Sequence, residues 1–409
     1  MREDVRQYYD GVSVYDIDED VRKAIIDRLG SKEASSGVDF VGLIWSGDRP
    51  SIFWPKGMTR RMDWKTDVRL LVRSLRRAAR SSNKGGRKTD SSGQIEMPPE
   101  IELLEDYEQN GLFDSRDRNY RSGHNGKIDW GRTIRMKTPV PGNSGSPVYI
   151  EPMVGFNLDS RGIIRKLHSY AVGIADKKFS WLLSSDGKPK ARELHGERLP
   201  VSRRVGLGLV RSELGRQFSD HKKKQLRLIE AFLSQGDASG GFSDSCIGIT
   251  SFHTVWEQMC SSYYGDQKSH YQSPAVPAYL FGTEVRMEAS NAPRPDAVIR
   301  DRDCLAIIDA KYYDFARTKP AWQDLVKQFF YAKAYSNDPQ YSRIENVLVL
   351  PDTNGEQASH AVVTDRYNVR MDSEFMPIKL VFLNVTEVMS HFVSGKENEA
   401  ARRTVFSAS

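Results

Sequence analysis

Two carboxylates and a lysine near residue 300 have the types and the spacing for metal-assisted hydrolysis. Asp296 follows Pro295, and the tripeptide Asp309-Ala310-Lys311 follows thirteen residues later. Carboxylate oxygens are hard ligands suited to Mg²⁺, which lowers the pKa of a bound water and offsets charge on a phosphorane. A nearby lysine orients the water or stabilises the pentavalent state. The set therefore predicts hydrolysis of a phosphodiester.

A β-hairpin is expected to bring these three side chains together. The pattern predicts strands over residues 295–300 and 304–312, with a turn at 301–303. Since side chains alternate along a strand, Asp309 and Lys311 share a face, and closure of the hairpin places Asp296 beside them. The alternative interpretation is an exposed hairpin with ordinary charged ends, because Asp-x-Lys tripeptides are common by chance.

Neighbouring segments favour the catalytic interpretation. Residues 322–335 form an amphipathic pattern typical of a helix that carries Gln328, and residues 252–260 predict an upstream helix that carries Glu257. The apolar runs 347–350 and 380–385 suit the buried inner strands of an α/β sheet. A further strand is predicted over residues 280–287. We therefore expect an α+β N-terminal domain of short strands and helices, followed by an α/β domain like those of PD-(D/E)xK restriction endonucleases.

The motif resembles the PD-(D/E)xK nuclease motif, and the chain around it is similar to LlaJI-type and McrC-like restriction subunits. The resemblance covers residues 252–350, the Phe53-Trp54-Pro55-Lys56-Gly57 turn and the segment 126–134 (GKIDWGRTI). It implies an endonuclease that cuts double-stranded DNA with Mg²⁺, or with Mn²⁺ in its place, and that depends on an McrB-like AAA+ GTPase or ATPase hexamer.

The resemblance also implies roles for individual residues. The expected catalytic residues are Asp296, Asp309, Lys311, Glu257 and Gln328, and the expected metal ligands among them are Asp296, Asp309 and Glu257. RecB-like nucleases of this class commonly place a tyrosine four residues after the glutamine, whereas Tyr331 lies three residues after Gln328.

Positive charge is concentrated in the middle of the chain. The net charge is +6, but residues 1–50 carry −4, residues 51–250 carry +13 and residues 251–409 carry −3. This segregation is expected of a protein that meets a polyanion with one region. The predicted helix 63–80 supplies the candidate DNA-binding residues Arg69, Arg73, Arg76, Arg77 and Arg80. A solvated face, or contact with an acidic surface of the partner, is the alternative interpretation.

Three other basic residues are candidates for partner binding. They are Lys56, Lys127 and Arg132, which lie in the two N-terminal motifs. Trp54 and Trp130 in the same motifs are expected to be core aromatics.

Composition shifts predict the domain organisation. An N-terminal domain for partner docking and DNA contact is expected over residues 1–234, a glycine- and serine-rich linker over 235–249, and the nuclease domain over 250–409. Within the first domain the pattern predicts a helix over the first thirty residues, a hairpin from 39–45 and 51–54, short strands and loops over 120–210, and a basic helix over 221–233.

Several classes of protein are excluded. Three widely spaced cysteines favour neither a disulfide framework nor a structural zinc site, and no apolar run approaches the length of a membrane span, so we expect a cytoplasmic protein. No GxxxxGK[ST] loop is present, so nucleotide hydrolysis belongs to another chain. Two alternatives stay open: a nuclease-fold DNA-binding or assembly module without catalysis, and a nuclease of a transposition or repair complex.

Overall fold

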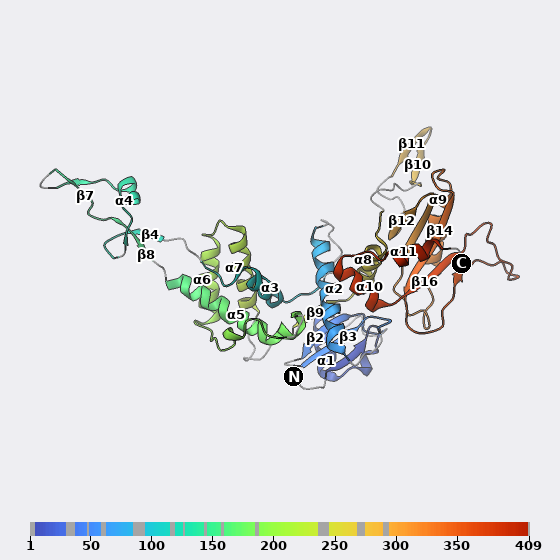
Figure 1. Ribbon diagram of the computed structural model, residues 1–409, viewed down its shortest axis with the longest axis horizontal. Helices are drawn as coiled ribbons and strands as arrows, with labels where there is room; N and C mark the ends of the chain where they lie inside the picture. The colour runs from blue at the N-terminus through green and yellow to red at the C-terminus, as the bar shows by residue number, and fades with distance from the viewer. Residues whose placement is uncertain are drawn as a thin grey trace. The chain divides into compact units, whose positions relative to one another are not determined.

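The chain folds into two compact units of mixed helices and sheets (Figure 1). The computed structural model describes residues 5–29, 37–46, 49–58, 63–84, 95–114, 119–125, 127–142, 145–156, 159–184, 188–235, 245–267, 275–288 and 294–407. Unit 1 comprises Met1–Met97 and Asp244–Ser409, and unit 2 comprises Pro98–Ser243.

This division differs from the one expected from composition, which placed residues 1–234 in one domain. Strand β9 (Cys246–Ile249) lies inside the expected linker 235–249, yet it pairs antiparallel with β2 (Val41–Ser46). The chain therefore leaves the first sheet, forms unit 2 and returns to the same sheet. Residues 236–244 of the expected linker lie outside the described residues. Composition cannot reveal a strand pairing that spans 200 residues.

The N-terminal sheet has the order β1-β3-β2-β9, with β1 at Arg6–Tyr9 and β3 at Arg49–Trp54. Its β2–β3 hairpin confirms the predicted one, although each strand is shifted by one or two residues. Trp54 is 3% exposed, which confirms it as a core aromatic. Phe40 and Phe53 pack edge to face in the same core.

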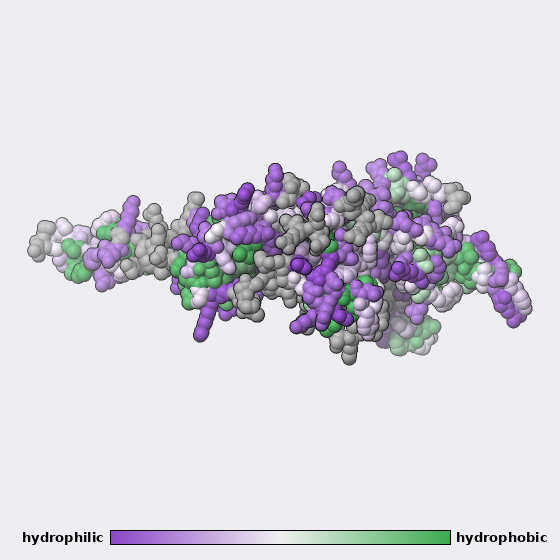
Figure 2. Space-filling view, turned by 90° about the horizontal axis from the view of Figure 1, so that it is seen from below, coloured by the Kyte–Doolittle hydropathy of each residue, from purple (hydrophilic) through white to green (hydrophobic). Residues whose placement is uncertain are grey.

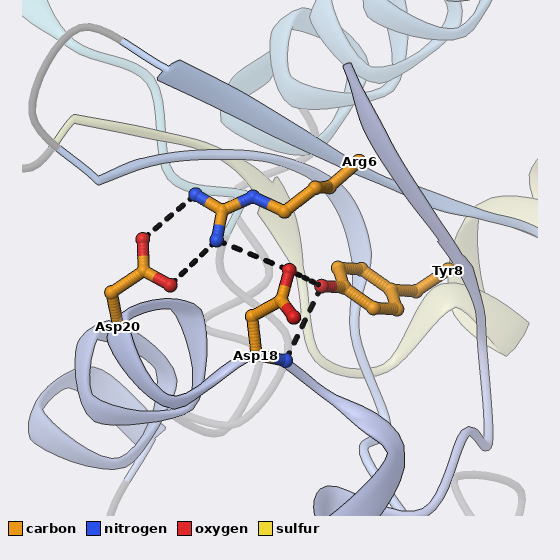
Figure 3. A network of polar contacts seen from close by, with 4 residues as sticks. All are labelled: Arg6, Tyr8, Asp18 and Asp20. Atoms are coloured by element: carbon orange, nitrogen blue, oxygen red, sulfur yellow. Dashed lines mark hydrogen bonds and ion pairs between the residues drawn. The ribbon is translucent and has the colours of Figure 1, made fainter. Parts of the chain in front are cut away.

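The prediction of one helix over the first thirty residues is wrong. The segment contains β1, a 3₁₀ turn at Val14–Asp16 and helix α1 (Glu19–Leu29). A polar network ties β1 to the start of α1 (Figure 3): Arg6 Nη1 lies 2.5 Å from Asp20 Oδ1 and 3.2 Å from Asp18 Oδ2, and Tyr8 Oη donates to Asp18 Oδ2 at 3.0 Å. These long-range polar contacts favour a strand where the apolar spacing alone suggested a helix.

The larger sheet of unit 1 has the order β12-β13-β14-β16-β15. The strands are β12 (Ala297–Asp301), β13 (Cys304–Ala310), β14 (Arg343–Pro351), β15 (His360–Ala361) and β16 (Ile378–Leu383). Strands β12 and β13 form the predicted antiparallel hairpin, and β13, β14 and β16 run parallel. The apolar runs 347–350 and 380–385 are thus confirmed as inner strands, apart from the last residues of the second run.

Helices cover both faces of this sheet. Helix α9 (Trp322–Ser336) packs through Tyr335 on Leu305 and Ile307. Helix α8 (Phe252–Tyr264) reaches Tyr312, whose ring centroid lies 5.2 Å from that of Phe252. Side chains alternate along β13 and the residues that follow it, so Leu305 and Ile307 face α9 whereas Tyr312 faces α8.

Three more helices complete unit 1, and α2 contacts both α8 and α10. They are α2 (Trp64–Lys84), α10 (Val385–Ser394) and α11 (Glu399–Phe406).

Between α8 and β12 the chain forms a separate two-stranded hairpin. Its strands are β10 (Ala278–Phe281) and β11 (Glu284–Met287), and all eight strand residues are exposed. The prediction of one continuous strand over 280–287 is therefore wrong, because the chain turns at Gly282, whose φ is +65°.

Unit 2 is built mainly of helices. They are α3 (Pro99–Asn110), α5 (Asp159–Leu183), α6 (Arg203–Leu214) and α7 (Asp220–Ser234). Their shared core includes Leu103, Leu167, Val210 and Ile229. The prediction of short strands and loops over 120–210 is wrong for α5 and α6, whose apolar residues pack in this shared core, and for a short helix over Trp130–Met136. The predicted helix over 221–233 is confirmed by α7.

The remainder of unit 2 consists of short elements. They are β4 (Asn119–Ser122), β5 (Lys127–Ile128), α4 (Trp130–Met136), β6 (Val140–Pro141), β7 (Pro147–Val148) and β8 (Met153–Phe156). Among the described parts of the whole chain, none of the helices has the length and apolar character needed to cross a bilayer.

Candidate active site

The β12–β13 hairpin brings the two motif aspartates together. Ala297 pairs with Ile308, so Asp296 and Asp309 follow as the next opposed positions. The Ala310 peptide N–H donates to Asp296 Oδ2 at 2.8 Å, which holds this carboxylate at the middle residue of the Asp-Ala-Lys tripeptide. The predicted convergence of Asp296 with the 309–311 segment is confirmed.

Asp309 and Lys311 form a close ion pair on the face of the sheet that carries Leu305 and Ile307. Lys311 Nζ lies 2.5 Å from Asp309 Oδ2, and both side chains are largely buried. Burial and the charge of Asp296 raise the pKa of Asp309 to about 6, although Lys311 lowers it. Burial lowers the Lys311 pKa, but Asp309 and Asp296 raise it more, so its net pKa is raised and it stays protonated.

Helix α9 adds a row of polar side chains beside this pair. Asp324, Gln328 and Tyr331 recur at steps of four and three residues, which places them on one side of the helix. Asp324 Oδ2 accepts a hydrogen bond from Tyr313 Oη at 2.9 Å, and its charge contributes to the raised pKa of Lys311. The pKa of Tyr331 is raised by burial and by the carboxylates of the hairpin. The α9 row therefore lies within electrostatic range of the carboxylate pair.

Gln328 links two strands below the site. Its Nε2 donates to the carbonyl oxygens of Ile307 (3.1 Å) and Val347 (3.0 Å), so the fully buried amide joins β13 to β14. Its Oε1 is buried and has no hydrogen-bond partner among the described residues. These contacts show how Gln328 positions the strands, and a catalytic role for it stays a prediction.

Glu257 lies on α8 and is half-buried. Burial raises the pKa of the Cys260 thiol, and the charges of Asp296 and Glu257 raise it further. Both carboxylates therefore act on the same buried thiol. A role for Glu257 as a ligand or catalytic group stays a prediction.

The carboxylate pair fits a divalent cation. Asp309 is buried beside a second carboxylate, and burial together with the charge of Asp296 raises its pKa despite the opposing effect of Lys311. A hard cation would relieve this repulsion through oxygen ligands, with waters filling its other positions. In the described part of the chain, no three His, Cys, Asp or Glu side chains gather closely enough to hold a metal. Asp296 and Asp309 are therefore the candidate protein ligands for a divalent cation at this site.

The five candidate arginines of α2 are less exposed than their spacing suggested. Arg80 is exposed, whereas the others are half-buried where α2 packs on α8 and α10. Arg77 differs most from the expectation: its Nη1 donates to the Val393 carbonyl at 3.2 Å and its guanidinium lies over the Phe392 ring. Arg77 therefore joins two helices of unit 1, and DNA contact by Arg69, Arg73, Arg76 and Arg80 stays a prediction.

Lys127 and Arg132 lie in unit 2, on residues 127–142 and 145–150, which we call the arm. Lys127 is exposed, and Arg132 is exposed beside Asp129, which caps α4. Trp130 is 56% exposed, so the expectation that it is a core aromatic is wrong. Other large apolar side chains of the arm are also exposed: Ile134, Met136, Val140, Val148 and Ile150. Figure 2 shows green, hydrophobic patches among purple ones at the left end of the view.

Sequence reasoning missed part of the site. Tyr313 and Asp324 were not selected, although the spacing of Asp324 from Gln328 was a usable signal. Lys56 contacts Asp10 and Tyr312 rather than facing solvent alone: Lys56 Nζ lies 3.6 Å from Asp10 Oδ2 and 4.7 Å from the centroid of the Tyr312 ring. Nothing local in the sequence indicates this cluster, because Lys56 and Tyr312 are 256 residues apart.

Comparisons with known proteins relate the chain to nuclease subunits of restriction systems. A component of the type II restriction enzyme BsuMI, YdjA of Bacillus subtilis (strain 168), is 22% identical over 398 residues, covering 89% of this chain and 83% of the relative. The model of the LlaJI restriction endonuclease family matches residues 40–386. The chain belongs to the LlaJI restriction endonuclease family.

Solved structures also include a chain that is similar to this one over nearly its whole length. The refined half-complex from the tetradecameric assembly of Thermococcus gammatolerans McrB AAA+ hexamers with bound McrC contains a chain that is 14% identical. The match covers 96% of this chain and 99% of the other, with a TM-score of 0.45.

Proposed function

We propose that this chain is the Mg²⁺-dependent endodeoxyribonuclease subunit of an McrBC-like restriction system that acts against phage DNA. The observation that carries the proposal is the convergence of Asp296, Asp309 and Lys311 on one hairpin of a five-stranded sheet. Two carboxylates and a lysine in this order would form the PD-(D/E)xK centre predicted from the sequence, and membership of a restriction endonuclease family supports this proposal.

The side chains of the site have distinct tasks in this proposal. Asp296 and Asp309 would hold the cation, and Glu257 of α8, which forms no three-ligand group with them among the described residues, would contact it through a water. The bound ion, Mg²⁺ or Mn²⁺, supplies a water of lowered pKa and a positive charge beside the scissile phosphate. Lys311 stays protonated and stabilises negative charge that develops on the phosphoryl oxygens. The Ala310 N–H fixes Asp296, and Gln328 fixes the spacing of β13 and β14.

Double-stranded DNA is the proposed substrate, and an McrB-like AAA+ GTPase or ATPase hexamer is the proposed partner. The GKIDWGRTI segment supports the partner, because it resembles McrC-like subunits and exposes Trp130 and Ile134 instead of burying them. Lys127 and Arg132 are exposed in the same segment and are proposed to contact the partner. The basic face of α2, with Arg80 as its exposed member, is the proposed contact with DNA phosphates.

A cleavage assay with matched variants tests the assignment. The full chain is mixed with supercoiled plasmid, with and without an McrB-like AAA+ protein, in Mg²⁺, Mn²⁺ or EDTA. Asp309→Ala and Lys311→Ala are expected to lower the cleavage rate by about 10²–10³-fold, because each removes charge used in the transition state. Asp301→Ala is the control, since Asp301 is an exposed carboxylate at the opposite end of the same hairpin.

A binding measurement separates catalysis from assembly. Mg²⁺ is expected to raise the thermal midpoint of the wild type and not that of Asp309→Ala, because ligands stabilise the state that binds them. Wild-type cleavage that persists in both variants would refute the assigned site. DNA binding or partner assembly without cleavage in any metal would favour the non-catalytic module, and cleavage that ignores the AAA+ partner would favour a transposition or repair nuclease.

A further inference from the structure

The Pro55-Lys56-Gly57 turn of the N-terminal segment lies against the sheet that carries the candidate site. The Lys56 peptide N–H donates to Tyr312 Oη at 2.7 Å. A Cβ built on Gly57 would lie 2.5 Å from the Asp352 carbonyl oxygen and 3.1 Å from Val385 Cγ2. Tyr312, Asp352 and Val385 follow the ends of β13, β14 and β16. The turn therefore meets the carboxyl ends of three neighbouring parallel strands.

A buried polar cluster secures this contact. Asp10 is buried, its Oδ2 lies 3.6 Å from Lys56 Nζ, and its carboxyl also hydrogen-bonds the Tyr312 hydroxyl. The Lys56 ammonium lies 4.7 Å from the centroid of the Tyr312 ring. On the other side, Phe252 and Trp256 of α8 pack against the same ring at 5.2 and 6.3 Å. Tyr312 is thus held between the N-terminal turn and α8.

Tyr312 is the residue directly after Lys311. The Lys311 peptide N–H donates to the Val349 carbonyl at 2.8 Å, so the backbone here still follows the edge of β14. Because consecutive side chains point to opposite faces, fixing Tyr312 on the α8 side fixes Lys311 on the side of Asp309 and α9. A shift of the Tyr312 ring would move the lysine ammonium away from its 2.5 Å contact with Asp309.

We propose that the Pro55–Gly57 turn is a positioning element of the nuclease centre, which through Tyr312 sets the placement of Lys311. This inference rests on the proposed function for its activity readout, and its chemical readout does not depend on that function. Lys56 and Tyr312 act through the strand end and are positioning residues. The N-terminal segment thereby has a direct route to the catalytic lysine, so events that displace the turn would change cutting without touching the carboxylates.

Two glycines provide a matched pair of substitutions. Gly57 (φ +80°) and Gly282 (φ +65°) both occupy the left-handed region, so alanine strains the backbone at either position. Only Gly57 has neighbours, since nothing lies within 4 Å of a Cβ at Gly282. Gly57→Ala should push the turn off the sheet, whereas Gly282→Ala should not. Tyr312→Phe is the second variant: it removes the hydroxyl that accepts from Lys56 and keeps the ring packing.

Cleavage kinetics give the first readout. Gly57→Ala and Tyr312→Phe are expected to lower kcat by about ten- to hundredfold, as a small misplacement of a catalytic group does, while KM for DNA changes by less than about twofold. Gly282→Ala is expected to match the wild type. If Gly57→Ala does not fold, Tyr312→Phe decides the outcome.

The labelling rate of Lys311 with an amine-reactive reagent, followed by mass spectrometry, gives the second readout. Loosening the 2.5 Å contact with Asp309 should free the largely buried Lys311 amine, so its labelling should become severalfold faster. Lys379 is the reference, because its Nζ donates to the Thr404 and Ser407 carbonyls of the same unit. Faster labelling of Lys311 relative to Lys379 in both variants supports the proposal.

Three results would overturn the positioning role. The first is an unchanged kcat and an unchanged Lys311 labelling rate in both variants. The others are an equal rise in the labelling rate of Lys379, or the same changes in Gly282→Ala. If the wild type cuts no DNA under any condition, the proposed function fails. The labelling ratio still decides the positioning role, because a raised ratio supports it and an unchanged ratio refutes it.

Discussion

Replacing Asp10 with asparagine is expected to stabilise unit 1 at neutral pH. The Asp10 side chain is 1% exposed, and its Oδ2 lies 3.6 Å from Lys56 Nζ. Burial raises the pKa of this carboxyl and nearby Asp39 raises it further, against the opposing effect of Lys56 and of hydrogen bonds, to about 6. Asparagine keeps the shape of the side chain and removes the charge.

The magnitude follows from the pKa shift. The ordinary value for this carboxyl is 3.8, so the shift is about two units, and at about 1.4 kcal/mol per unit the buried charge costs about 3 kcal/mol. The folded-state pKa lies above the unfolded one, so the protonated carboxyl favours folding below pH 3.8 and that contribution is lost as the pH rises through 6. The free energy of unfolding of Asp10→Asn should therefore equal that of the wild type near pH 4 and exceed it by up to about 3 kcal/mol at pH 7.5.

Urea unfolding followed by tryptophan fluorescence provides the assay. Five of the seven tryptophans, at positions 45, 54, 64, 256 and 322, belong to unit 1, so this signal reports mainly on that unit. The difference in free energy of unfolding between variant and wild type is measured at several pH values from 4.5 to 8. Taking this difference cancels the contributions of titratable groups that both proteins share. A variant that is less stable at pH 7.5, or a difference that does not grow between pH 5 and 7.5, would refute the reasoning.

Two further predictions concern unit 2. Trp130→Ala is expected to weaken AAA+ binding by at least about thirtyfold, because an interface tryptophan contributes about 2 kcal/mol to binding. The thermal midpoint should stay unchanged, since Trp130 is exposed. Unchanged affinity in a titration with the AAA+ protein would contradict this prediction. Burial lowers the pKa of His168 to about 4, so the unfolded chain takes up the proton first and unit 2 should lose about 3 kcal/mol as the pH falls from 6.5 to 4. His168→Asn, which can still accept from the Phe113 N–H, should flatten that dependence in hydrogen exchange of α5, and an unchanged slope would show that another group is responsible.

The core of the candidate site was predictable because it is local. Asp296, Asp309 and Lys311 lie within sixteen residues, and a hairpin with a short turn determines their register once the strands alternate. The same holds for the α9 helix, whose apolar period is visible in 322–335. The partners that adjust the site were not predictable: the Gln328 amide reaches two backbone carbonyls, and neither contact leaves a pattern in side-chain types.

The sequence alone predicted two carboxylates and a lysine on a hairpin that is flanked by helices and inner strands. It also indicated the resemblance to subunits of restriction systems. The tertiary structure decided that the N-terminal segment belongs to the same unit as that centre, because β9 returns to pair with β2. It also decided that Trp130 is exposed while Trp54 is buried, although both were expected to be core aromatics. The physical reason is the same in each case: periodicity and turn chemistry act over a few residues, whereas burial depends on which distant segments cover a surface.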